Sequence, residues 1–470
     1  MAEHWANLDL HLDVDLDASR LGRSLEDALR AAIRDGRLPT GTRLPSSRAL
    51  AADLGIARNT VADAFGQLVA EGWLTARTGA GTFVTDVATP PAAKAAPVPA
   101  LPGSGSRRGA RYDLHPGVPD LSAFPRREWL AATRRALASA PDHLLTYPDP
   151  RGVPPLREAL AGYLARSRGV SADPERIVVC AGFMHGLAVL AQVLSARGAR
   201  SVAVESYCLP EHNAVLSRAG LRRAPLPADA RGAVPADVSL NAAGAALLTP
   251  AHQFPLGMTL APARRRMFAE WAAGTGAAVI EDDYDGEFRY DRHPVGAMQS
   301  LAPDHVVYGG TASKALAPGL RLGWLVVPGR LLDEVVTAAR LAGGPDAVSQ
   351  LTLAEFITSG GYDRQVRHAR LAYRRRRDRL VAALGQAAPL ARVTGIAAGL
   401  HAVVELAPGR AEADAIASAQ RHGVGVSGLS QFAADGSKGQ HPPALVVGYA
   451  TPPPHAYTTA IARLAAALAE

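Results

Sequence analysis

Residues 306–328, VVYGGTASKALAPGLRLGWLVVP, hold two apolar runs, 306–308 and 322–327, on either side of a segment of small and polar residues. Short apolar runs bounded by glycine and proline are typical of buried strands. Similar runs recur upstream and alternate with longer segments of helical spacing: 177–180, 201–205, 245–249 and 277–282. This alternation predicts an α/β fold with a doubly wound, mostly parallel sheet that is buried on both faces.

Three of these runs end on polar side chains, and the carboxyl ends of strands are where such sheets bind ligands. The polar ends are Thr249-Pro-Ala-His-Gln253, Glu281-Asp-Asp-Tyr284 and Gly310-Thr-Ala-Ser-Lys314. Lys314 is one of only three lysines in a chain that has 47 arginines. A guanidinium stays protonated, whereas a primary amine can lose its proton and attack a carbonyl. We therefore predict that Lys314 forms a Schiff base.

The residue types around this lysine suit pyridoxal phosphate. Thr311 and Ser313 offer hydroxyls for a phosphate, and Arg321 offers a fork of donors. An acid at the end of the run 277–282 would pair with a protonated pyridine nitrogen, and Tyr284 would donate to the phenolate oxygen. Each residue alone also has an ordinary explanation, as a surface lysine or a structural acid pair. It is the whole set that predicts the cofactor.

The stretch 86–110, DVATPPAAKAAPVPALPGSGSRRGA, is rich in proline, alanine, glycine and serine and shows neither strand nor helix periodicity. Such a composition predicts a linker. It would separate a small domain at 18–85 from a large domain at 111–470. The alternative is a long surface loop within one domain.

The small domain has the pattern of a winged helix-turn-helix. An apolar stripe predicts a first helix over 24–35, a second helix is expected from residue 46 or 47 to 54, and a third begins at Arg58. Two helices joined by a tight, glycine-containing turn are a helix-turn-helix candidate. Runs 73–77 and 82–85 flank a glycine-rich tip, which predicts a two-stranded wing.

The small domain also places suitable side chains for contact with double-stranded DNA. The first turn of the third helix would present base-reading groups to a major groove: Arg58, Asn59 and Thr60. Hydroxyl and guanidinium groups at the second helix would hold phosphate: Arg43, Ser46, Ser47 and Arg48. Gly81 in the wing would let the backbone approach DNA closely. Any one of these residues is more often simply solvated, whereas the ordered set predicts a DNA-binding surface.

Residues 41–84, GTRLPSSRALAADLGIARNTVADAFGQLVAEGWLTARTGAGTFV, resemble the GntR-type winged helix almost continuously. Four further runs resemble fold-type I aminotransferases: 146–169, 249–260, 265–291 and 308–328. Together they make the chain similar to the MocR family, in which a GntR winged helix is joined by a linker to an aminotransferase-like domain. The resemblance spans nearly the entire chain.

This resemblance implies operator binding, a pyridoxal 5'-phosphate cofactor and a homodimer. By position, it implies Lys314 as the cofactor lysine, Asp282 as the partner of the pyridine nitrogen and Tyr284 as the partner of the phenolate oxygen. It also implies that Arg321 binds the phosphate and that Tyr147 reaches a phosphate in the partner subunit. It also implies DNA contacts by Arg43, Ser46, Arg48, Arg58, Asn59, Thr60 and Gly81. Glu281 and Asp283 adjoin Asp282, so the spacing to Tyr284 leaves the choice among three acids open.

Three departures from the aminotransferase pattern argue against amino-acid transamination. Where an aromatic ring would stack on the cofactor, the run 205–209, ESYCL, has Leu209, with Tyr207 as the alternative. In 182–186, GFMHG, His185 is either a ligand or an ordinary turn residue. The stretch 441–450, HPPALVVGYA, lacks the arginine with which enzymes of this fold hold a substrate carboxylate.

Composition narrows the classes further. The 470 residues are 48% hydrophobic and carry a net charge of +7, which is enough apolar material for two or three domains. Two cysteines in apolar stretches indicate neither an oxidising compartment nor a zinc site. With no secretory signal and no apolar run of membrane length, we expect a cytoplasmic protein without a membrane partner.

We therefore expect a transcription regulator rather than an enzyme. It would bind operator DNA as a homodimer and sense pyridoxal phosphate, an amine or an amino acid. The alternative is a catalytically active aminotransferase with an appended DNA-binding domain.

Overall fold

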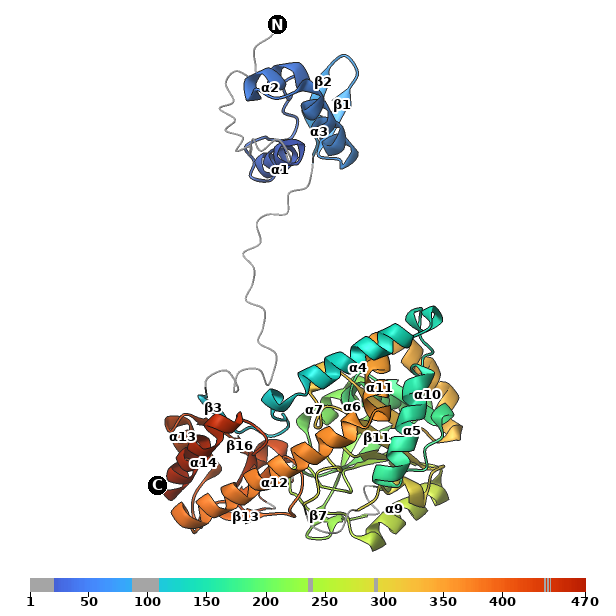
Figure 1. The fold of residues 1–470 in the computed structure, drawn as a ribbon, viewed down its shortest axis with the longest axis vertical. Helices are drawn as coiled ribbons and strands as arrows, with labels where there is room; N and C mark the ends of the chain where they lie inside the picture. The colour runs from blue at the N-terminus through green and yellow to red at the C-terminus, as the bar shows by residue number, and fades with distance from the viewer. Residues whose placement is uncertain are drawn as a thin grey trace. The chain divides into compact units, whose positions relative to one another are not determined.

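The computed structural model describes residues 21–86, 110–235, 240–290, 295–434, 437, 439 and 441–470. The chain folds into two compact units, Met1–Ala100 and Leu101–Glu470 (Figure 1). The expected linker at 86–110 lies outside the described residues except for its two ends, and residues 18–20 of the expected small domain lie outside them as well.

The small unit has three helices followed by a two-stranded antiparallel wing. Its elements are α1 (Leu21–Arg34), α2 (Ser47–Leu54), α3 (Arg58–Ala70), β1 (Leu74–Arg77) and β2 (Gly81–Val84). Ser46 caps α2 by accepting a hydrogen bond from the Ala49 N–H at 3.2 Å, and Gly55 ends it in the left-handed region with a φ of 67°. The winged helix-turn-helix pattern read from the sequence is thus present, with α1 beginning three residues earlier than expected.

One apolar core holds the small unit together. The three helices and the wing all contribute fully buried side chains to it, among them Leu25, Leu29, Val61, Leu68 and Leu74. Every residue of this cluster comes from the small unit. At about 25 cal/mol per Å² of apolar surface removed from water, such a core is the main stabilising contribution to a unit of this size.

The large unit is built on a seven-stranded sheet with the strand order β4-β12-β11-β10-β9-β5-β6. The strands are β4 (Ile177–Cys180), β5 (Ser201–Glu205), β6 (Arg222–Leu226), β9 (Ala245–Leu248), β10 (Ala278–Asp282), β11 (Val306–Thr311) and β12 (Gly323–Val326). All neighbours pair in parallel except β12, which is antiparallel to both β11 and β4. The expected mostly parallel sheet is therefore confirmed.

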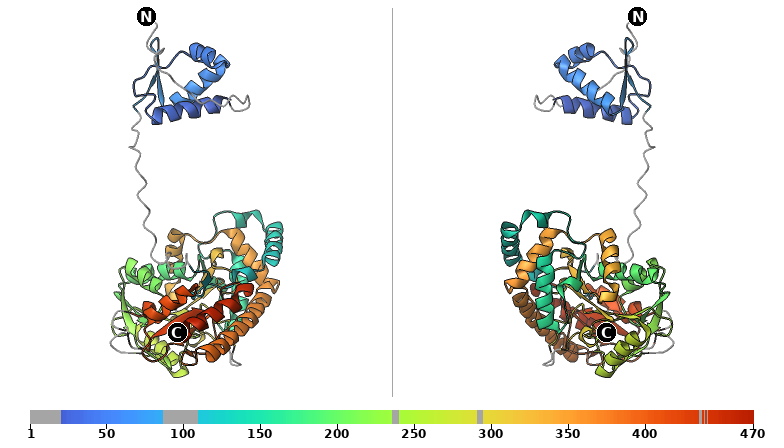
Figure 2. Two further views of the ribbon diagram at one scale, coloured as in Figure 1. Left: turned by 90° about the vertical axis from the view of Figure 1, so that its left-hand side faces the viewer. Right: turned by 90° about the vertical axis from the view of Figure 1, so that its right-hand side faces the viewer.

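Helices cover both faces of this sheet (Figures 1 and 2). Alternate strand residues such as Val178, Ile280 and Leu325 pack with α6 (Phe183–Ala196), α7 (Pro210–Arg218) and α10 (Gly329–Ala342). Their sequence neighbours face the opposite layer, which holds α5 (Pro154–Arg168), α9 (Pro262–Thr275) and α11 (Ala347–Thr358). Burial on both faces explains why these strands are continuous apolar runs.

The C-terminal part adds a second, smaller sheet of order β13-β14-β17-β16. It is connected to the large sheet through the 27-residue helix α12 (Gly361–Ala387), drawn in orange in Figure 1. The remaining elements of this part are β13 (Arg392–Thr394), β14 (His401–Glu405), α13 (Glu412–Arg421), β15 (Val424–Gly425), β16 (Ser427–Gly428), β17 (Ala444–Gly448) and α14 (Pro454–Ala469).

The large unit has further elements outside its two sheets and their covering helices. Among them are the helix α4 (Arg126–Ser139) and the short elements β3 (Tyr112–Asp113), the 3-10 helix η2 (Asp142–Leu145), β7 (Ala228–Asp229), β8 (Gly232–Ala233) and the 3-10 helix η5 (Pro318–Leu320). β3 pairs in parallel with β15, so the start of the large unit is tied to its C-terminal part. Among the described helices, none has the length and apolar character needed to span a bilayer.

The strand β6 was not anticipated from the sequence. It lies at the edge of the sheet, and its residues Arg222 to Pro225 are exposed or half-buried. An edge strand is covered less than a central one, so polar residues are tolerated and the apolar signal is lost.

Because the small unit has its own core, we expect Leu68→Ala to destabilise that unit alone. Leu68 is fully buried, and emptying such a site typically lowers the free energy of unfolding by ~2–5 kcal/mol. Calorimetry should show the thermal transition of the small unit lowered and that of the large unit unchanged. Leu341→Ala, at a side chain that is 85% exposed, is the control and should shift neither. Equal lowering of both transitions by Leu68→Ala would contradict separate folding of the units.

Candidate functional site

Glu281 and Asp282 end β10 and Asp283 follows it, and the structure gives these three acids different surroundings. Glu281 accepts hydrogen bonds from the Met298 and Gln299 N–H groups at 2.8 and 2.9 Å. Asp283 lies 2.6 Å from the Arg168 guanidinium and also accepts from the Tyr308 hydroxyl at 2.8 Å. Asp282 is equally buried, but its Oδ1 has no hydrogen-bond partner among the described residues.

The electrostatics of Asp282 are those of a buried acid beside an amine. Burial raises the pKa of Asp282 well above its usual range, and the charge of Lys314 opposes that rise. His212 of α7 places Nε2 at 3.7 Å from Asp282 Oδ2. Burial, and secondarily Arg223, lowers the pKa of His212 to about 4, so this imidazole is neutral at pH 7. The His212 ring thus supports the carboxylate without a formal charge.

Lys314 follows β11, the strand that pairs with β10. Its half-buried Nζ donates to the Gly117 carbonyl at 2.6 Å. In the same turn, Thr311 Oγ1 lies 2.8 Å from Ser313 Oγ and accepts from the Ser313 N–H at 3.1 Å. The parallel pairing of two neighbouring strands therefore brings Asp282 and Lys314 to one edge of the sheet.

A second group of donors surrounds the N-terminus of α6. Arg321 is the only non-glycine residue with positive φ in the described part of the chain, at 53°. Its guanidinium lies against Gly182, where a Cβ would be 3.4 Å from Nη1. His185 Nδ1 accepts from the Ala181 N–H at 3.0 Å, so the ring proton is on Nε2, which is buried and has no hydrogen-bond partner in the described part of the chain. A guanidinium, an unpaired N–H donor and a helix N-terminus together form an anion-binding cradle.

Phe183 joins the cradle to the buried acid. It is the first residue of α6, and a Cβ on Gly309 of β11 would overlap its ring. The Phe183 and His212 ring centroids are 5.9 Å apart, in an edge-to-face arrangement. The cradle and the acid are therefore two ends of one site.

The sequence did not single out the network around Tyr284. His252 Nδ1 lies 2.8 Å from Asp285 Oδ2 and 3.2 Å from the Tyr284 hydroxyl oxygen. Burial raises the pKa of Tyr284 well above its usual range, and Asp285 raises it further, so the phenol keeps its proton. His252 stands in the polar strand end 249–253, which was the signal available in the sequence.

His401 completes a buried cluster with His252 and Asp285, in which one ligand-type atom of each lies within 4.8 Å of the others. Each group already has a hydrogen-bond partner, since His401 Nε2 lies 3.0 Å from the Pro255 carbonyl oxygen. Burial lowers the pKa of His401 to about 3. We interpret the cluster as a hydrogen-bond network rather than as a metal site.

Two departures noted in the sequence have a structural counterpart. Leu209 lines a small cavity together with Cys208, His212, Thr249 and Phe254. The Tyr207 ring is directed elsewhere: its hydroxyl donates to the Ser437 carbonyl at 2.9 Å, and its ring meets His441 edge-on. Tyr207 therefore does not occupy the position of Leu209.

The C-terminal strand β17 is buried and apolar throughout. Arg376 of α12 reaches the chain that follows it, donating to the Ala450 and Pro452 carbonyls. The charge of Arg376 is neutralised by Asp120, whose Oδ2 lies 2.5 Å from Arg376 Nη2. Arg376 is thus fully engaged within the protein.

Tyr147 and the predicted DNA contacts are surface positions in the structure. Tyr147 follows η2 and is 98% exposed. On the small unit, six of the eight predicted DNA contacts are exposed, and Ser47 and Thr60 are half-buried; the exposed ones are Arg43, Ser46, Arg48, Arg58, Asn59 and Gly81. Gly81 has a φ of 113°, and a Cβ there would be 3.0 Å from Arg43 Nε, so a side chain would disturb the wing.

Because Asp282 and Asp283 have different surroundings, we expect their replacement by Asn to change the free energy of unfolding in different ways. Asp283→Asn leaves the buried Arg168 charge unpaired and should lower the free energy of unfolding by ~3–5 kcal/mol. Asp282→Asn should leave the stability of the cofactor-free protein unchanged or raise it. The pKa of Asp282 is higher in the folded than in the unfolded state, so wild-type stability falls as pH rises, and the advantage of Asn should grow from about pH 5 to pH 8.

Urea unfolding of the cofactor-free variants at these pH values measures both effects. Equal destabilisation by the two substitutions would show that Asp282 is a structural acid like its neighbour.

Comparison with known proteins agrees with the two-unit fold. Residues 114–464 match the family of class I and II aminotransferases, and residues 21–84 match bacterial regulatory proteins of the gntR family. The gntR match identifies the small unit as a DNA-binding domain. Among solved structures, the large unit resembles kynurenine aminotransferase of Pyrococcus horikoshii in complex with PMP. The TM-score is 0.67 at 23% identity, over 76% of this chain and 90% of that one.

Relatives similar over most of the chain are named as regulators. The probable rhizopine catabolism regulatory protein MocR of Rhizobium meliloti is 35% identical over 79% of this chain and 78% of its own length. The pyridoxine biosynthesis transcriptional regulator PdxR of Corynebacterium glutamicum is 33% identical over 81% of this chain and 82% of its own. With a GntR-type head, an aminotransferase-like body and such relatives, this chain belongs to the MocR family of transcriptional regulators.

Proposed function

We propose that the large unit binds pyridoxal phosphate through a Schiff base at Lys314, and that this cofactor, alone or with an amine or amino-acid ligand, changes operator binding by the small unit. The observation that carries the proposal is that the Lys314 amine, the unpartnered Asp282 Oδ1 and the anion cradle at Arg321 meet in one site. These are the groups that a phosphorylated pyridine aldehyde needs.

The buried acid fits the ring-nitrogen end of such a cofactor. A carboxylate oxygen buried without a partner is unfavourable, and a protonated pyridine nitrogen would supply the missing donor and the missing charge. Glu281 and Asp283 already have their partners, which supports Asp282 among the three acids. His212 then acts as the neutral neighbour that orients the carboxylate.

The cradle fits the phosphate end. Arg321 supplies a charged fork, His185 Nε2 an unpaired N–H, and the first turn of α6 free backbone N–H groups. Thr311 and Ser313 add hydroxyls from the turn before Lys314. His185, ambiguous in the sequence, is thereby proposed as a ligand rather than as an ordinary turn residue.

When bound, pyridoxal phosphate supplies an aldehyde carbon that condenses with a primary amine, losing water, to give an imine that absorbs visible light. Lys314 offers the amine, and the Gly117 carbonyl orients its Nζ. Tyr284 keeps its proton at pH 7 and can donate a hydrogen bond to the cofactor's phenolate oxygen. His252 and Asp285 hold the Tyr284 hydroxyl in place.

The surroundings of β17 favour sensing over transamination. An enzyme of this kind must grip the substrate carboxylate, and β17 offers only buried apolar side chains. Arg376, which donates to carbonyl groups just after this strand, is already held by Asp120. A ligand amine can still exchange with Lys314 without such a grip, which suits binding more than turnover.

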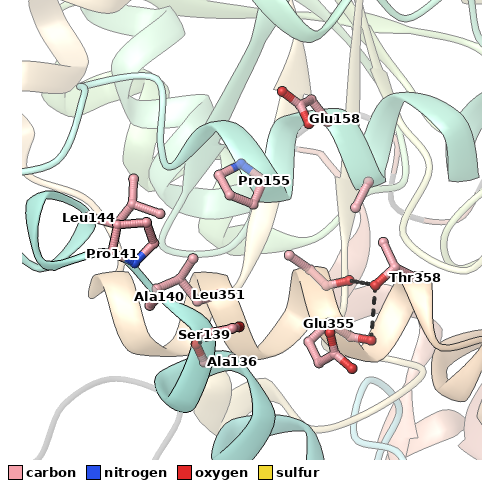
Figure 3. Close-up of a pocket in the computed structure, with 12 residues that line it drawn as sticks. Ala136, Ser139, Ala140, Pro141, Leu144, Pro155, Glu158, Leu351, Glu355 and Thr358 are labelled. Carbon is pink, nitrogen blue, oxygen red and sulfur yellow. Dashed lines mark hydrogen bonds between the residues drawn. The ribbon is translucent and has the colours of Figure 1, made fainter.

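We also propose a homodimer formed through the side of the large unit that carries Tyr147. Exposed leucines gather on α4, just before it and in η2: Leu121, Leu130, Leu137 and Leu145 are 44–60% exposed. Beside them, α4, α5 and α11 enclose a groove of about 420 Å³, with Pro141 and Leu144 at one end (Figure 3). Exposed apolar patches of this kind mark protein interfaces, and a second copy would cover them.

Lys314→Ala should abolish the visible absorbance of protein incubated with pyridoxal phosphate, because Lys314 is the only lysine among the described residues and its charge acts on Asp282. Lys94→Ala, which also removes one of the three lysines, is the matched control and should keep the absorbance. Borohydride reduction followed by peptide mass mapping should place the adduct on Lys314. An adduct on either other lysine would reject this site.

Operator binding is tested by electrophoretic mobility on DNA from upstream of the chain's own gene, with and without cofactor. We expect a salt-sensitive, sequence-selective complex whose affinity changes between the two states by the ~5- to 150-fold that is usual for allosteric coupling. Arg58→Ala should weaken this complex by ~1–3 kcal/mol while sparing non-cognate DNA if Arg58 contacts a base edge.

An equal loss of affinity for all DNA sequences would instead indicate that Arg58 contacts a phosphate. Equal affinity with and without cofactor would exclude pyridoxal phosphate itself as the effector, and absence of a selective complex in both states would exclude the operator-binding proposal.

A further inference from the structure

Helix α12 carries a charge out of proportion to its length. Its 27 residues include eight arginines and two aspartates, so its net charge is +6, whereas the entire chain of 470 residues has +7. One helix of the large unit therefore carries a net charge almost as large as that of the whole chain.

Most of these guanidinium groups face solvent. Arg376 is buried against Asp120, and Arg370 and Arg377 are half-buried. The five exposed ones are Arg364, Arg367, Arg374, Arg375 and Arg379. Their spacings of 3, 7, 1 and 4 residues keep them on one side of the helix, opposite the buried stripe that includes Val366, Tyr373 and Leu380. We call these five residues the arginine face.

The fold itself does not explain the arginine face. None of its members forms an ion pair with a carboxylate in the part of the chain that the structure describes, and Arg364 only donates to the Ser359 carbonyl at 3.2 Å. The helix dipole favours cations in the last turn, but the last turn of α12 has no basic residue. Arg364 and Arg367 stand near the positive end instead, and Arg375 and Arg379 repel each other at i,i+4. The charge is thus unfavourable unless an external anion compensates it.

We propose that the arginine face binds the phosphate backbone of the DNA that extends beyond the winged-helix contacts; this rests on the proposed operator binding. From Arg364 to Arg379 the helix rises ~22 Å, which is the length of about six base pairs along the DNA axis at 3.4 Å each. Guanidinium groups bind phosphate through paired N–H donors and need no base contact.

A lipid surface fits this face less well than DNA does. Helices that lie on membranes insert an apolar face, and the apolar face of α12 is buried in the protein, leaving only Leu371 and Val381 as exposed large apolar side chains on this helix. The large unit therefore adds a sequence-independent contact to the sequence-selective contact of the small unit.

The experiment uses the full-length protein with cofactor and two duplexes that share one operator site, one of ~20 bp and one of ~80 bp. The variant replaces the five arginines of the arginine face by Gln. We expect its affinity for the long duplex to fall by at least ~10-fold at physiological salt, and its slope of log K against log salt to fall by ~2 or more. Affinity for the short duplex should stay within about twofold, because that duplex ends at the winged-helix contacts.

Two control variants distinguish the effect of where the positive charge lies from the effect of how much positive charge is removed. One variant replaces five exposed arginines elsewhere on the large unit by Gln, namely Arg200, Arg218, Arg222, Arg266 and Arg340, and should keep long-duplex binding. Another replaces the arginine face by Lys and should retain part of the affinity, since the positive charge is kept while the paired N–H donors are lost.

The outcomes separate this inference from the proposed function. If both Gln variants lose the same affinity for the long duplex, the effect is one of net charge and the inference is overturned. An unchanged affinity of the arginine-face variant for the long duplex would also overturn it, as would a variant that loses binding only to vesicles of anionic lipid. Wild-type protein that binds neither duplex selectively would overturn operator binding, and the arginine face with it. Wild-type protein that binds both duplexes equally would overturn the arginine face alone.

Discussion

Carboxylates are costly to bury, and three of them stand in succession at the end of β10, Glu281 and Asp282 within the strand and Asp283 just after it. The protein satisfies the first with backbone N–H groups and the third with Arg168 and Tyr308, which makes both of them structural. Asp282, between them, keeps an oxygen without a donor and a raised pKa. The rest of the site follows from this one unsatisfied group, because parallel pairing of β10 with β11 sets Lys314 beside it.

Close backbone packing then builds the opposite end of the site. Arg321 is held in a left-handed conformation that only a well-determined surrounding structure maintains. Gly182 and Gly323 allow that approach, since a Cβ on Gly323 would be 2.9 Å from the Gly182 backbone. The anion cradle is therefore a product of strand and helix packing rather than of a flexible loop. A rigid cradle suits a cofactor that is bound permanently while other ligands come and go.

A regulator makes smaller demands on such a site than an enzyme does. Turnover requires a grip on the substrate carboxylate, which β17 does not offer, whereas signalling requires only that two states differ by ~1–3 kcal/mol in ligand affinity. The exposed leucines near Tyr147 and the arginine face of α12 are the two surfaces of the large unit that we propose for a second copy and for DNA. Both surfaces are compatible with a body that transmits ligand binding to a DNA-binding head.

The sequence by itself determined the fold class and the winged helix, because hydrophobic period and capping residues are local signals, and the scarcity of lysine singled out Lys314 as a candidate. Only the tertiary structure distinguished the surroundings of Glu281, Asp282 and Asp283, since their hydrogen-bond partners lie up to 115 residues away in the chain. The same holds for the contacts of His212, His252 and Arg376, and for the edge strand β6. Such contacts depend on which distant segments the fold brings together, and a linear pattern does not carry that information.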